Sequence, residues 1–166
     1  SVVLPTMEVN SEAVISEVRD AEGDYLVYSG PGGTILRKEI LGQGKQFIHV
    51  HPGWLPAYRG STTVYYSLLV DKTVSCSVFL MRESLDAGPL VYQKKFLLTD
   101  MDLDFDYVLD PAVRASALME FFSGAQEYLD NQWNQPTDEG DTFYIIHPVL
   151  KHMAILGVKG NEIESR

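Results

Sequence analysis

Apolar positions along the chain alternate between short continuous runs and longer stretches with helical spacing. Short β-branched and aromatic runs bounded by Gly, Pro, Asn, Asp or Ser predict buried strands, and apolar residues recurring every three or four positions predict helices. Strands are predicted at 2–4, 25–28, 46–51, 74–81, 90–98 and 142–146. Helices are predicted after a cap at Asn10 or Ser11, at 34–41, at 61–69, from Asp110 through Leu129, and at 148–156 with Gly157 as its stop.

This order of elements predicts an α/β fold with a mostly parallel sheet covered by helices on both faces. Only a turn at 84–89 separates the runs at 74–81 and 90–98, so these two strands are predicted to pair antiparallel at one edge of the sheet. We expect residues 1–166 to form one domain. Its motif-bearing part is 1–98, and 99–166 is a C-terminal helical extension of the same domain.

Composition and charge narrow the range of partners. The 166 residues include 13 Lys and Arg against 23 Asp and Glu, and the net charge of -10 disfavours non-specific binding to nucleic acid or to an anionic membrane. Cys76 is the single cysteine, which excludes an intrachain disulfide and a cysteine-based zinc site within this chain. No apolar run approaches the roughly 20 residues of a membrane span, and the first residues do not resemble a signal peptide. The cytoplasm is the simplest location.

The strongest chemical signal is the segment FIHVHPGWLPAYRG at 47–60. His49 and His51 are two residues apart on a predicted strand, so their side chains point to the same face, and both approach the carboxyl end of that strand. Ligands of open parallel sheets bind just beyond such strand ends. An isolated histidine is more often structural, but two on one face at this position indicate a functional site.

The segment HPGWLPAYRG at 51–60 resembles the His-Pro-x-x-Leu-Pro-x-x-x-Gly signature of formyltransferases that use 10-formyltetrahydrofolate. This group includes methionyl-tRNA, glycinamide ribonucleotide and nucleotide-sugar formyltransferases. The turn LDAGPL at 85–90 matches the family's Asp-x-Gly turn, and 28–36 resembles the loop that faces the pterin. The resemblance covers 2–98 and implies a doubly wound, Rossmann-like sheet. Because the chain opens at Ser1 directly in a strand-like run, we expect the N-terminal portion of that sheet to be missing.

The resemblance implies catalytic roles for three residues. Formyl transfer to an amine passes through a tetrahedral oxyanion, which requires hydrogen-bond donors, and the attacking amine must lose a proton. By resemblance, His51 supplies a donor or a positive charge to the oxyanion, and Asp86 orients His51 and helps to move the proton. The family commonly has Asn where this chain has His49. Either His49 replaces that amide, or activity is altered or lost.

The resemblance and the position in the motif loop suggest further binding residues. The residues expected to bind the folate are Gly30, Pro31, Gly32, Gly33, Ile35 and Leu85. Trp54, Tyr58 and Arg59 are candidates for the acceptor site. The two aromatic residues either line a cleft or pack against the sheet, and Arg59 either pairs with a phosphate or carboxylate or is solvated.

The predicted function is formyl transfer from 10-formyltetrahydrofolate to the primary amine of a nucleotide-linked amino sugar. Methionyl-tRNA and glycinamide ribonucleotide are alternative acceptors, a non-catalytic folate-binding relative is an alternative of another class, and a homodimer is left open. No metal is expected, because the Asp-rich run at 99–106 lacks the Gly and Glu that complete a calcium loop.

Overall fold

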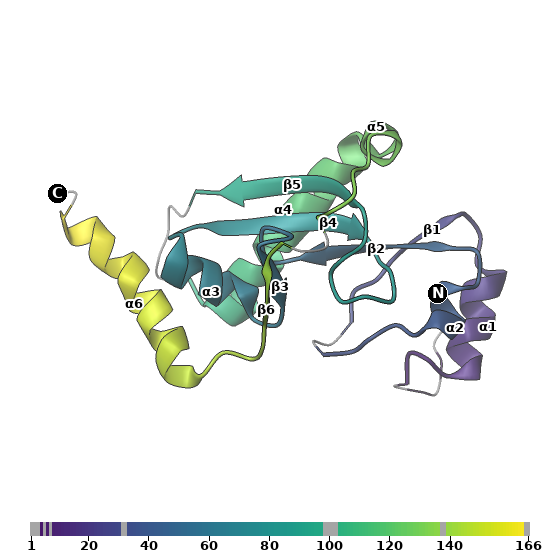
Figure 1. The fold of residues 1–166 in the computed structure, drawn as a ribbon, viewed down its shortest axis with the longest axis horizontal. Coiled ribbons are helices and arrows are strands. Elements are labelled where there is room, and N and C mark those ends of the chain that lie inside the picture. The colour runs from purple at the N-terminus through teal and green to yellow at the C-terminus, as the bar shows by residue number, and fades with distance from the viewer. Residues whose placement is uncertain are drawn as a thin grey trace.

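The computed structural model of the chain is an α/β structure built on a four-stranded sheet (Figure 1). It describes residues 4, 6, 8–30, 33–97, 103–136 and 139–164, with side chains as far as 158. The sheet has the order β1 (Tyr25–Val27), β2 (Gln46–His51), β4 (Val74–Leu80), β5 (Leu90–Phe96), and a second sheet pairs β3 (Tyr58–Gly60) with β6 (Asp141–Phe143). The helices are α1 (Glu12–Asp20), α2 (Lys38–Leu41), α3 (Thr63–Val70), the π-helical turn η1 (Phe105–Leu109), α4 (Asp110–Ser123), α5 (Ala125–Asp130) and α6 (Pro148–Glu164). The strand predicted at 2–4 falls largely outside the described residues.

Strand directions confirm the predicted mostly parallel sheet with an antiparallel edge. β1 pairs parallel with β2, whereas β4 is antiparallel both to β2 and to β5. Consequently β1, β2 and β5 run in the same direction and β4 alone runs against them. The antiparallel pair predicted at one edge is β4 with β5.

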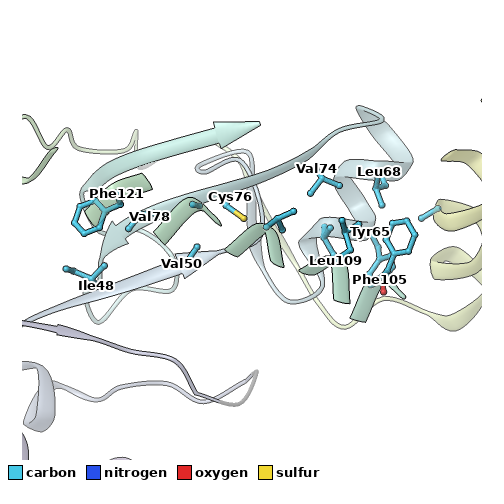
Figure 2. Close-up of a cluster of buried hydrophobic side chains, with 14 of the residues drawn as sticks. Ile48, Val50, Tyr65, Leu68, Val74, Cys76, Val78, Phe105, Leu109 and Phe121 are labelled. Atoms are coloured by element: carbon cyan, nitrogen blue, oxygen red, sulfur yellow. The ribbon is translucent and has the colours of Figure 1, made fainter. Parts of the chain in front are cut away.

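Helices cover both faces of the sheet, and β2 alternates between them. Ile48 and Val50 face the main core, where they meet Cys76 and Val78 of β4 and Phe121 of α4 (Figure 2). On the other face, the neighbouring Phe47 joins a smaller core formed with α1 and α2. Burying each of these side chains contributes about 1.5–3 kcal/mol. Because residues two apart on a strand share a face, His49 and His51 lie on the face opposite to Ile48 and Val50.

Helix α2 is shorter than predicted because Asn10 holds the preceding residues extended. The Asn10 side chain donates from Nδ2 to the carbonyl of Ile35 (2.9 Å) and accepts at Oδ1 from the amide of Arg37 (2.8 Å). Leu36, between these two residues, is buried. The helix therefore begins at Lys38 and not at Thr34, and Ser11 occupies the N-cap position of α1 without a capping hydrogen bond from its side chain.

The C-terminal part also differs from the prediction in its boundaries. The helix predicted from Asp110 through Leu129 is interrupted at Gly124, which separates α4 from α5. Helix α6 continues past Gly157 to Glu164, so the predicted stop is wrong. Figure 1 shows α6 against α3 at one end of the molecule, with α1 and α2 beside β1 at the other. Among the described residues, no helix combines the length and the apolar character that a membrane crossing needs.

Candidate active site

His51, the last residue of β2, has a buried imidazole whose Nε2 is fully engaged. Nε2 lies 2.7 Å from the carbonyl oxygen of Tyr58 and 3.2 Å from Oγ1 of Thr63. A carbonyl only accepts, and the Thr63 hydroxyl already donates to the carbonyl of Pro52 (2.7 Å). Nε2 therefore carries the hydrogen, and in the neutral ring Nδ1 holds the lone pair.

Asp86 comes from the loop between β4 and β5 and faces Nδ1 of His51. Its Oδ2 is 3.5 Å from that nitrogen and accepts a hydrogen bond from the backbone amide of Gly60 (2.8 Å). The backbone of Asp86 is left-handed, with φ of 48°, a conformation that Asp tolerates better than most residues. The structure thus brings together the two residues that sequence analysis places at the reaction centre.

The protonation of His51 reflects two opposing effects. Burial lowers the pKa of His51 and is the larger effect, while the charge of Asp86 opposes it. The carbonyl of Tyr58 also favours the protonated ring, and His49 and Arg114 disfavour it. The net lowering leaves a neutral imidazole at neutral pH, with the Nδ1 lone pair directed at Asp86. Such a pair can accept one proton and hold it between nitrogen and oxygen.

The loop that follows His51 is bound to the sheet through Ser77, its partner across the β2–β4 ladder. The Ser77 hydroxyl donates to the carbonyl of Gly53 (2.7 Å) and accepts from the amide of Leu55 (3.0 Å). There is no room for a side chain at position 53, because a Cβ on Gly53 would lie 2.9 Å from Nε2 of His51. The glycine of the His-Pro-Gly sequence therefore lets the loop close around the imidazole.

His49 is half-buried and lies two residues before His51 on β2, so the two side chains share one face of the sheet. Its Nδ1 lies 3.0 Å from the carbonyl of Tyr28, so Nδ1 carries a hydrogen, and its ring meets Phe79 edge-on at 5.8 Å. The neutral ring has only this one N–H. For that reason His49 can donate a second hydrogen bond, from Nε2, only when the ring is doubly protonated.

The residues expected to bind the folate lie on two exposed loops. Gly30, Gly33 and Ile35 follow β1, and Leu85 precedes Asp86. The side chains of Ile35 and Leu85 are 59% and 50% exposed, so both are accessible to an apolar ring. Pro31 and Gly32 lie outside the described residues.

The three candidates for the acceptor site have different surroundings. Trp54 is half-buried, with Nζ of Lys95 over its ring at 4.9 Å. Tyr58 is buried, and its hydroxyl donates to Asp71 (2.7 Å), which together with burial raises the pKa of Tyr58. Arg59 donates to the carbonyls of Pro136 (3.0 Å) and Glu139 (2.8 Å). Its guanidinium therefore holds Pro136 and Glu139 against the motif loop.

A cavity of about 550 Å³ lies beside the motif loop. Aromatic and acidic side chains share its lining, which includes Trp54, Tyr58, Phe143, Asp71, Glu139 and Asp141. Within the described part of the chain, no group of three or more His, Cys, Asp or Glu side chains is placed to hold a metal ion.

Sequence analysis missed the contacts that Gln135 and Phe143 make with the site. Of these two residues it places only Phe143 in an element, the strand predicted at 142–146. The amide of Ser61 donates to the carbonyl of Phe143 (2.9 Å), and the Gln135 side chain donates to the carbonyls of Asp86 (3.0 Å) and Gly88 (2.7 Å). These are contacts between residues far apart in sequence, and no local pattern signals them.

Comparisons with known proteins identify the family by sequence and find a similar fold among solved structures. The family model described as formyl transferase matches residues 4–107. A methionyl-tRNA formyltransferase of Wolbachia pipientis subsp. Culex pipiens is 40% identical over 72 residues, which cover 42% of this chain and 24% of that protein. A sugar N-formyltransferase from Shewanella sp. FDAARGOS_354 has a similar fold, with a TM-score of 0.64, 20% identity, and 90% of this chain and 65% of the other covered.

A third match carries bound molecules. The formyltransferase PseJ from Anoxybacillus kamchatkensis, solved with UDP-4,6-dideoxy-4-formamido-L-AltNAc and tetrahydrofolate, has a TM-score of 0.60 and 20% identity, with 74% of this chain and 65% of PseJ covered. The present chain spans less than two thirds of the length of each of these three proteins.

Proposed function

This chain belongs to the formyl transferase family, and we propose on that premise that it transfers a formyl group from 10-formyltetrahydrofolate to a primary amine. The observation that carries the proposal is the approach of His51 to Asp86, with Nδ1 and Oδ2 3.5 Å apart at the carboxyl end of β2. Resemblance assigns these two residues to the reaction. Their meeting from the end of β2 and the loop between β4 and β5 is what an acid–base pair requires.

In the proposed reaction the amine nitrogen bonds to the formyl carbon, and the bond from that carbon to the folate nitrogen breaks. The pair formed by His51 and Asp86 takes up the proton that the amine loses, and the proton then passes to the leaving folate nitrogen. His49 donates from Nε2 to the oxygen on which negative charge develops. Ile35 and Leu85 would flank the pterin ring of the folate, which supplies the formyl group.

We propose a nucleotide-linked amino sugar as the acceptor. The net charge of -10 supports a small acceptor over a tRNA, whose phosphates such a chain repels. The Shewanella and Anoxybacillus proteins provide chemical precedents on the same fold. Methionyl-tRNA is the second candidate, supported by the relative from Wolbachia at 40% identity.

The test is a transfer assay with the full-length protein. Purified protein is incubated with 10-formyltetrahydrofolate and, in separate reactions, a UDP-linked amino sugar, methionyl-tRNA or glycinamide ribonucleotide. Tetrahydrofolate release is followed by absorbance, and the formamide product by mass spectrometry. Release that depends on the sugar supports the proposal, and release that depends on another amine corrects the acceptor. Folate binding without turnover identifies a non-catalytic relative and overturns the proposed activity.

A cytoplasmic location and a homodimer remain predictions.

A further inference from the structure

Asp86 is held from its backbone side by Gln135, a residue that neither the motifs nor the proposed reaction includes. Gln135 is 7% exposed. The two hydrogens of its Nε2 are directed at two carbonyl oxygens of the Asp86 loop, those of Asp86 itself (3.0 Å) and of Gly88 (2.7 Å). One side-chain amide thus holds two peptide groups of this loop, Asp86–Ala87 and Gly88–Pro89.

The register of the chain delivers Gln135 to this position. Trp133 forms an antiparallel bridge with Leu90, in which each amide donates to the other's carbonyl, at 2.8 and 3.0 Å. Continuing the same register for two residues places Gln135 opposite Gly88. Pro136 follows directly and favours the extended backbone that this pairing needs.

The same loop is pinned on two further sides. The amide of Gly60 donates to Oδ2 of Asp86 (2.8 Å), which orients the carboxylate toward His51. Gly88 packs so closely on β4 that a Cβ there would lie 1.7 Å from the carbonyl oxygen of Leu80. Gln135 holds the remaining side of the loop, and without its side-chain amide the carbonyls of Asp86 and Gly88 lose this hydrogen-bond donor.

We infer that Gln135 is a positioning residue that sets the distance from the Asp86 carboxylate to Nδ1 of His51. The inference rests on the proposed function for its kinetic consequence, because it assigns Gln135 an effect through Asp86 and no contact with substrate. Displacement of a catalytic group by about 1 Å lowers a rate on the order of a hundredfold.

The kinetic test is a double-variant cycle in the full-length protein. Gln135→Leu is expected to lower kcat on the order of a hundredfold with KM for donor and acceptor unchanged. In the Asp86→Asn background it is expected to change kcat by less than about twofold, because the residue through which it acts is already disabled. Gln126→Leu is the control. It removes an exposed side-chain amide that donates a hydrogen bond to Asp130, and it is expected to leave the activity unchanged. An equal loss in both backgrounds, or wild-type kcat for Gln135→Leu, overturns the inference.

A second readout does not depend on turnover. Nuclear magnetic resonance of the His51 ring follows its titration, to which Asp86, His49 and Arg114 contribute charge. Both Gln135→Leu and Asp86→Asn are expected to move the midpoint to lower pH, and Gln126→Leu is expected to leave it in place. If the wild type transfers no formyl group but this shift occurs, the proposed function fails and the positioning role stands. An unmoved midpoint overturns the positioning role whatever the activity.

Two further variants separate an effect on the position of Asp86 from a general loss of stability. Val113→Ala truncates a buried residue of α4 in the main core and lowers stability without changing a residue of the Asp86 loop. It is expected to keep wild-type kcat per folded molecule. Gln135→Asn retains polarity but is one methylene shorter, and serves as the second variant if Gln135→Leu does not fold. A fall in kcat for Val113→Ala equal to that for Gln135→Leu would assign the loss to stability and overturn the inference.

Discussion

Oδ2 of Asp86 lies 3.5 Å from Nδ1 of His51, and the amide of Gly60 holds the same oxygen at 2.8 Å. The second contact explains why the first is well defined. The carboxylate is anchored by β3, the short strand that also supplies the carbonyl of Tyr58 to the opposite ring nitrogen of His51. One strand therefore positions both members of the pair.

Asp86→Asn is expected to lower kcat by about 10²–10⁴-fold while the fold is retained. The amide oxygen of Asn can still accept from Gly60, and Asn tolerates the left-handed backbone, but the amide cannot take up a proton at neutral pH. Steady-state transfer kinetics and thermal melting measure the two quantities. Asp20→Asn, on the exposed end of α1, is the matched control. Full activity of Asp86→Asn would remove Asp86 from the reaction.

The lowered pKa of His51 predicts a pH-dependent stability. As pH falls below about 6.5, the unfolded chain binds a proton that the buried ring resists, so the free energy of unfolding decreases. The contribution is at most about 1.4 kcal/mol per pH unit, and stability returns as pH rises. The contribution of His51 is measured by comparing the free energy of unfolding in urea of the wild type and of His51→Asn between about pH 7.5 and about pH 5.5. The wild type should lose stability more steeply than the variant toward acid, and parallel curves would contradict this.

His49 is expected to act in its doubly protonated form, because its Nδ1 hydrogen is committed to the carbonyl of Tyr28. His49→Ala should lower kcat by about 10²–10³-fold, the usual cost of one oxyanion donor. His49→Asn restores an amide donor and should keep kcat within about tenfold of wild type. Steady-state transfer kinetics of the two variants test this, and a much faster Asn variant would show that the histidine is not adapted to the reaction.

The parts of the fold that sequence patterns predict are those fixed by burial. The run at 46–51 is buried along most of its length, and β2 has the predicted bounds. The antiparallel pair β4 and β5 follows from two apolar runs joined by a turn. The meeting of His51 and Asp86, by contrast, was predictable only from the resemblance of two motifs, since no spacing rule relates the residues.

The remaining features depend on single hydrogen bonds between distant residues. Asn10 shortens α2 by binding the backbone at Ile35 and Arg37, and Gln135 binds the loop of Asp86 in the same way. A side-chain amide that pairs with a remote peptide group leaves no periodicity in its own neighbourhood. The structural roles of Asn10 and Gln135 can therefore be recognised only in the folded structure.

Gly88→Ala is expected to destabilise the protein by about 2–4 kcal/mol and to displace Asp86. The added methyl group would meet the backbone oxygen of Leu80 at 1.7 Å, so β4 or the loop must move. Gly23→Ala is the control, since Gly23 has φ of 79° and open space around it, and it should cost only about 1–2 kcal/mol. Denaturant unfolding compares the two. An equal cost at both positions would show that the loop does not need the close approach.

Cys76 should be unreactive in the native protein and fully reactive on unfolding. Its thiol is buried in the main core, and burial raises the pKa of Cys76 to about 12, so almost no thiolate is present at neutral pH. Because it is the chain's only cysteine, labelling by a thiol reagent reports opening of this core alone. Phe121→Ala removes a fully buried side chain of the same cluster and should lower the free energy of unfolding by about 3–5 kcal/mol. When the core opens and closes rapidly compared with labelling, each 1.4 kcal/mol should make the labelling of Cys76 about tenfold faster. The neighbouring Phe122 is 53% exposed, so Phe122→Ala should change the labelling rate little. Fast labelling of the wild type without denaturant would contradict the placement of the β4 thiol in the core.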